Sequence, residues 1–76
     1  MKTKVAFRKF EDGSVIALFP SDVNPNNGMI GSYMHVGQHS DASPSLVNEL
    51  SLASPAEFAL LKEELIRIGY DVEVVP

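Results

Sequence analysis

The chain of 76 residues has no cysteine and no tryptophan. The absence of cysteine excludes disulfide bonds, thiolate metal ligands and a cysteine nucleophile, and it suits a reducing compartment. Long apolar runs are also missing, because the longest, at residues 15–19, has five members whereas a membrane helix needs about 20. We therefore expect a cytoplasmic protein with no membrane-spanning segment, whose hydrophobic core stabilises the fold without disulfide bonds.

Basic residues are scarce as well. Six Lys and Arg residues stand against ten Asp and Glu residues, which gives a net charge of −4 and a pI of about 4.9. Such a chain is poorly suited to nucleic acid as its main partner, since phosphate contacts need positive charge. With 45% hydrophobic and 21% charged residues, the composition indicates one globular domain, residues 1–76, with no room for a second.

One segment, residues 54–69, predicts an α-helix from its first residue to its last. Ser54 and Glu57 form a capping-box pattern, Pro55 suits the first helical position, and Gly69 offers a left-handed stop. Four apolar side chains recur at helical spacing and form one stripe: Phe58, Leu61, Leu65 and Ile68. Because such a stripe needs an apolar surface to cover, we expect the helix to pack on a sheet.

Alternating apolar residues predict strands at residues 2–10, 15–19, 29–36, 46–52 and 70–75. Asp12 and Gly13 indicate a hairpin with a two-residue turn, which would pair Phe7 with Leu18. Residues 46–52 fit a helix or a strand, and we favour a strand because Ser54 opens a new helix directly afterwards. The predicted fold class is therefore α+β, a mixed, mostly antiparallel sheet of about five strands in the order β-β-β-β-α-β with one helix packed on one face.

The first hairpin carries apolar side chains on both of its faces. A one-residue bulge in the turn would shift the register, but it would not gather all of these side chains on one side. Since a single helix covers only one face of a sheet, we predict that the second face is uncovered and pairs with another surface. The predicted function is a small non-enzymatic binding module that forms a homodimer or binds a protein partner through this face, with no cofactor.

The segment from Ser32 to Asp41 is richer in polar and aromatic groups than folding alone requires. Tyr33 and His35 are expected on the face away from the core, where rings with polar tips favour partner contacts. The candidate partner-binding residues are Tyr33, His35, Gln38, His39 and Asp41. The alternative is that Tyr33 and His35 are ordinary surface or second-core residues and that residues 37–45 form a well hydrogen-bonded loop.

The same segment allows a metal-dependent hydrolase as an alternative. His35 and His39 are four residues apart, about 13 Å in an extended chain, so they share an ion only if the chain turns at Gly37. Asp41 would then be a third ligand. A histidine with Ser40 and Asp41 also supplies the residue types of a hydrolase triad, although the nucleophile-elbow pattern is missing. We assign no catalytic residue and no metal ligand on this basis.

A third alternative, a nucleic-acid-binding regulator, depends on Lys2, Lys4 and Arg8. These residues share one face of the first predicted strand and form a basic stripe. Lysines on an edge strand more commonly prevent edge-to-edge pairing, and we favour that role here.

Three stretches carry a resemblance that covers nearly the whole chain: FRKFEDGSVIALFP, SYMHVGQHSDASP and SPAEFALLKEELIRIGYDVEVV. They resemble a group of short uncharacterised proteins encoded by gut bacteria and their phages, with residues 23–27 and 45–52 the least similar. The resemblance implies an intracellular setting, with a phage or other mobile element as one source. It implies no activity, so no catalytic or ligand residue is carried over from it.

Overall fold

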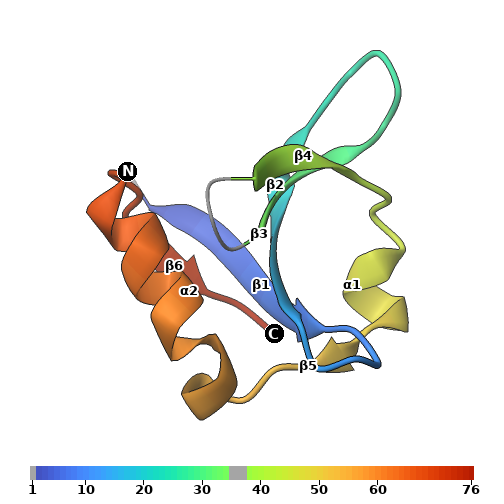
Figure 1. Ribbon diagram of the computed structural model, residues 1–76. Helices are drawn as coiled ribbons and strands as arrows, with labels where there is room; N and C mark the ends of the chain where they lie inside the picture. The colour runs from blue at the N-terminus through green and yellow to red at the C-terminus, as the bar shows by residue number, and fades with distance from the viewer. Residues whose placement is uncertain (1, 35–37) are drawn as a thin grey trace.

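The computed structural model describes residues 2–34 and 38–76, which form one six-stranded sheet and two helices (Figure 1). The strands are β1 (Thr3–Lys9), β2 (Val15–Val23), β3 (Ile30–Met34), β4 (Gln38–Ala42), β5 (Ser51–Leu52) and β6 (Val72–Val74), and the helices are α1 (Leu46–Glu49) and α2 (Pro55–Arg67). The strand order is β4-β3-β2-β1, and the other edge of β1 pairs with β6 at residues 3–5 and with β5 at residues 8–9. The predicted α+β class with a mostly antiparallel sheet is confirmed. No helix of the described residues is long and apolar enough to cross a membrane.

The hairpin between β1 and β2 has a three-residue loop, so the predicted two-residue turn is wrong. Phe7 lies opposite Ala17 and not opposite Leu18. The Phe10 carbonyl accepts from the Gly13 N–H at 2.9 Å, and the Phe10 N–H donates to the Ser14 carbonyl at the same distance. Gly13 has a φ of 89°, the left-handed conformation that places an extra residue in such a loop. The shift by one residue decides which side chains of the two strands share a face.

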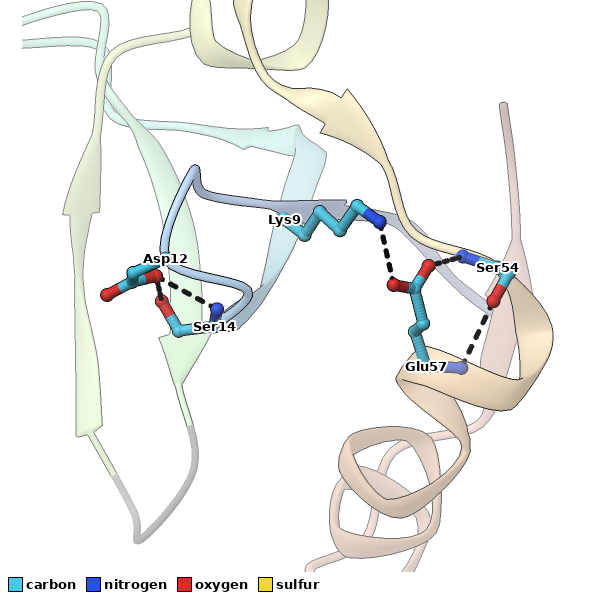
Figure 2. Close-up of polar contacts among 5 residues, drawn as sticks. All are labelled: Lys9, Asp12, Ser14, Ser54 and Glu57. Atoms are coloured by element: carbon cyan, nitrogen blue, oxygen red, sulfur yellow. Dashed lines mark hydrogen bonds and ion pairs between the residues drawn. The ribbon is translucent and has the colours of Figure 1, made fainter.

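The face beneath α2 carries the core that the helical stripe predicts. Phe58, Leu61 and Leu65 are buried against the sheet, and the Phe58 ring stacks on Phe7 with centroids 4.3 Å apart. The capping box is present, since Ser54 and Glu57 bond to each other's backbone N–H groups (Figure 2). Ile68 departs from the prediction because the helix ends at Arg67, and its side chain is 50% exposed.

The opposite face of the sheet is covered by the chain itself, so the predicted uncovered face is wrong. Five residues of this face are buried, namely Ala6, Ile16, Leu18, Ile30 and Ala42. Leu46, Val47 and Leu50, from α1 and its end, pack over them. In Figure 1, α1 and α2 lie on opposite sides of the sheet. The described part of the chain therefore builds two cores, one on each face.

The assignment of α1 corrects two further predictions. Residues 46–52 are not one strand: they form the four-residue helix α1 and then the two-residue strand β5. The fourth strand is instead β4, in the stretch where the sequence predicts a polar loop. Polar side chains are compatible with this strand because β4 lies at the edge of the sheet, where three of its side chains face solvent.

Arg8 joins the sheet to α1. Its side chain is only 4% exposed, and its Nε donates to the Val47 carbonyl at 2.8 Å while Nη1 donates to the Phe7 carbonyl at 3.0 Å. The predicted basic surface stripe is therefore wrong, because Arg8 is buried while Lys2 and Lys4 are exposed. The predicted edge-protecting role is also wrong, since β1 is flanked by strands on both sides.

Candidate functional site

The outer edge of β4 brings together the exposed members of the predicted site. β4 pairs with β3 along one side, and no described strand pairs with its other side. His39, Ser40 and Asp41 are all exposed on this strand. His39 lies opposite Tyr33 and Asp41 lies opposite Gly31, so the two side chains point to the same face, two residues apart.

A shallow hollow of about 320 Å³ lies on this face beside β4. Its walls come from three strands and the segment before β6, and its lining residues are Phe19, Asp22, Gly31, Ser32, His39, Ser40, Asp41 and Tyr70. The Phe19 and Tyr70 rings stack with centroids 5.3 Å apart and form the apolar wall. The volume is at the lower end of the range for small-molecule pockets, and no deep cleft encloses it.

The imidazole of His39 is held by two tyrosines. Its Nε2 lies 3.1 Å from the Tyr70 hydroxyl, and its ring meets the edge of Tyr33 with centroids 4.7 Å apart. These contacts orient an exposed side chain that would otherwise sample several rotamers. His39 is thus presented in one position at the edge of the sheet.

Two carboxylates lie on the same face as His39. Asp41 lies opposite Gly31, and the Asp22 carboxylate sits over Gly31, where a Cβ would collide with it. Neither carboxylate accepts a hydrogen bond or joins an ion pair among the described residues, so both charges face solvent there without a basic partner. This end of β4 therefore combines an oriented imidazole with two carboxylates that form no ion pair among the described residues.

The remaining predicted residues lie elsewhere. Tyr33 is 2% exposed in the core under α2, and its hydroxyl donates to the Glu64 carboxylate, so the prediction that it lies on an exposed face is wrong. Tyr33 and Ile30 lie on opposite faces of β3, and the face that carries Tyr33 is the one covered by α2. His35 lies outside the described residues. Gln38 is the first residue of β4, opposite Met34.

The described residues show no arrangement that supports either enzymatic alternative, the metal site or the hydrolase triad. Among residues 2–34 and 38–76, no group of three or more His, Asp or Glu side chains is placed to hold a metal ion. The metal hypothesis requires His35, which lies outside these ranges, and it stays a prediction. For the hydrolase triad, the Ser40 hydroxyl donates to the Asp41 carbonyl at 3.4 Å and no bond joins it to His39, so these two residues are not linked as nucleophile and base. A triad that uses His35 stays a prediction.

Asp22 and Tyr70 were not among the predicted site residues. Gly31 is the signal that points toward Asp22, because a glycine inside a strand often marks a place where another group approaches closely. Nothing in the sequence pattern links Tyr70 to His39, which lies 31 positions away along the chain.

Comparison with protein-family models, with curated proteins and with solved structures found no match to this chain.

Proposed function

We propose that this protein is a non-enzymatic binding module that acts by self-association through the outer edge of β4. The observation that carries the proposal is a five-residue edge strand whose exposed side chains include His39 and Asp41. An edge strand presents a row of backbone N–H and C=O groups that pair readily with a strand of another chain. The contact surface is thus the edge of the sheet, in place of the face that the sequence analysis favoured.

The other edge of the sheet is less suited to this role. β5 has two residues and β6 has three, and short strands are one way in which proteins protect an edge. The middle residue of β6 is Glu73, which would face its own copy in a symmetric pairing and repel it. β4 is longer, and its sequence QHSDA contains neither lysine nor proline, the residues that most often block pairing.

We also propose a cytoplasmic setting, which is supported by the absence of cysteine from the sequence. The resemblance to short proteins of gut bacteria and their phages suggests where such a module is encoded, and a mobile element stays a proposal. Neither point affects the proposed contact surface, because that proposal is argued from β4 alone.

The test combines sedimentation velocity with amide hydrogen exchange of the wild-type protein over a series of concentrations. We expect a monomer to dimer transition, accompanied by slower exchange of β4 amides as the dimer forms, because the outward N–H groups gain acceptors. Amides of β6 serve as the internal control and should not change. A monomer at every concentration, or protection confined to β6 or α2, would overturn the proposal.

A further inference from the structure

We propose that the partner of β4 is the β4 strand of a second copy, paired antiparallel about a two-fold axis at Ser40, so that His39 of each copy faces Asp41 of the other. This inference rests on the proposed function and specifies its partner and register. An isologous contact of this kind closes after two copies, whereas a heterologous edge contact would continue into a fibre.

Symmetry limits the registers that are available. A two-fold axis perpendicular to the sheet makes the two strands antiparallel and keeps each side chain on its own face of the sheet. Because side chains alternate between the faces, a residue can lie opposite only residues an even number of positions away. Centring the axis on Ser40, the middle of the five residues of β4, pairs all of them, with Gln38 opposite Ala42 and His39 opposite Asp41.

The side chains that face each other favour this register over the two registers in which the axis is moved by one residue. Moving the axis by one residue toward the C-terminus of β4 places Asp41 opposite Asp41 of the second copy, and moving it the other way places His39 opposite His39. Two carboxylates directly opposite each other destabilise a strand pair, and two imidazoles lack the carboxylate acceptor that each has when it lies opposite Asp41. Only the axis at Ser40 sets an imidazole, which can donate a hydrogen bond, against a carboxylate, and it does so twice.

The side chains are already arranged for this contact. Tyr70 and Tyr33 hold the His39 ring at the edge, so little rotamer freedom remains to be lost on pairing. The Asp41 carboxylate has no hydrogen bond among the described residues, and Asp22 adds a second negative charge beside Gly31 on the same face. Directly opposite residues in an antiparallel pair have Cβ atoms about 4.5–5.5 Å apart, within reach of an imidazole and a carboxylate.

Charge reversal tests the register. We expect His39→Asp and Asp41→Lys each to weaken dimerisation about tenfold or more, because the first sets two carboxylates opposite each other and the second removes the carboxylate that faces His39, in both cases at both symmetric positions. An equal mixture of the two variants should form a heterodimer of near wild-type affinity, since each contact then joins an acidic and a basic side chain. Glu73→Lys on β6 is the matched control for Asp41→Lys, with the same change in net charge at the other edge, and it should leave dimerisation unchanged.

Cross-linking provides a second measurement that does not depend on charge. The chain has no cysteine, so Ser40→Cys introduces a single thiol, which lies opposite its own copy in this register. Residues opposite each other in a strand pair have the Cα separation that a disulfide needs. We expect Ser40→Cys to form a covalent dimer under mild oxidation and the matched control Ser51→Cys, on β5, to form none above the level of random collision.

The outcomes separate this inference from the proposed function. A wild-type protein that is monomeric at all concentrations overturns both. A wild-type dimer that is protected at β4, combined with no rescue in the variant mixture and no Ser40→Cys cross-link, overturns the register and leaves self-association through β4 standing. Rescue together with cross-linking supports the register.

Discussion

The face of the sheet beneath α2 and the face beneath α1 exclude water equally well, but very different elements cover them. Leu65, which α2 packs onto one face, and Leu18, which lies on the other face under α1, are both 0% exposed. α2 has thirteen residues and a complete capping box, whereas α1 has four residues and no hydrogen bond from its N-cap side chain to the helix backbone. A helix of four residues has no stability of its own, because its single turn bears the cost of nucleation without propagation. The second face therefore depends on tertiary contacts that hold α1 in place.

Arg8 and three apolar side chains supply those contacts. The guanidinium bonds to the Val47 carbonyl within α1, and Leu46, Val47 and Leu50 pack on the buried residues of the second face. The comparison shows that a short segment can bury one face of the sheet in a small domain. Here a long side chain from the sheet donates a hydrogen bond to a backbone carbonyl of the short helix. The comparison also shows why counting long helices underestimates the buried area.

The largest expected effect tests whether the two cores are equivalent. Leu18→Ala and Leu65→Ala should each lower the free energy of unfolding by about 2–5 kcal/mol, since both leucines are fully buried and truncation leaves a cavity. Urea denaturation of both variants beside the wild type measures the two losses. If Leu18→Ala costs less than about 1 kcal/mol while Leu65→Ala falls in the expected range, the segment over the second face does not exclude water as described.

A smaller effect is expected from removing the hydrogen bond between Arg8 and α1. Arg8→Met keeps most of the apolar stem and removes both donors, so the Val47 carbonyl loses the donor that Arg8 supplies, whereas the Phe7 carbonyl keeps the Ala53 N–H. We expect the free energy of unfolding to fall by about 1–3 kcal/mol. Amide exchange should accelerate in α1 more than in α2, which identifies the loss as local. An equally stable variant would instead show that the desolvation of the guanidinium outweighs its hydrogen bonds.

The smallest effect concerns the N-terminus of α2 and its link to β1. The Lys9 ammonium lies 2.7 Å from Glu57 Oε2, and the Ser54 N–H donates to Oε1 at 2.8 Å (Figure 2). The hydrogen bond from Lys9, followed by that from the Ser54 backbone, lowers the pKa of Glu57 from 4.5 to about 2. Because the folded pKa is the lower one, the ionised group stabilises the fold above pH 4.5, and this contribution is lost as the pH falls toward about 2.

Glu57→Gln tests this dependence, since glutamine keeps the capping geometry and removes the charge. The wild type should be more stable than the variant above pH 4.5, and the difference should shrink as the pH falls to about 2 in thermal unfolding. Asp12→Asn is the comparison variant. Hydrogen bonds from Ser14 also lower the pKa of Asp12, but these bonds lie within the loop between β1 and β2 and not at the N-terminus of α2 (Figure 2). A constant difference between wild type and Glu57→Gln across this range would contradict the assignment.

Local signals predicted α2 well and β4 badly, for reasons that lie in how each is stabilised. Ser54, Pro55 and Glu57 act within one helical turn, so their pattern is complete in the sequence. In β4, Ser40 and Asp41 belong to residue types that are common in loops, and the strand exists because β3 supplies a hydrogen-bonding edge. The sequence analysis named His39 and Asp41 as candidates, but it did not predict that they lie on the same face of the sheet.

Residue order alone determined the α+β class, both caps of α2 and the alternation that places Ile30 and Tyr33 on opposite faces of β3, because each depends on neighbours a few positions away. Tertiary structure decided that Tyr33 faces inward, that Arg8 is buried, and that residues 46–49 turn into a helix over the second face. These outcomes depend on contacts between segments far apart in the chain, such as Arg8 with Val47, whose energy appears only when both surfaces meet.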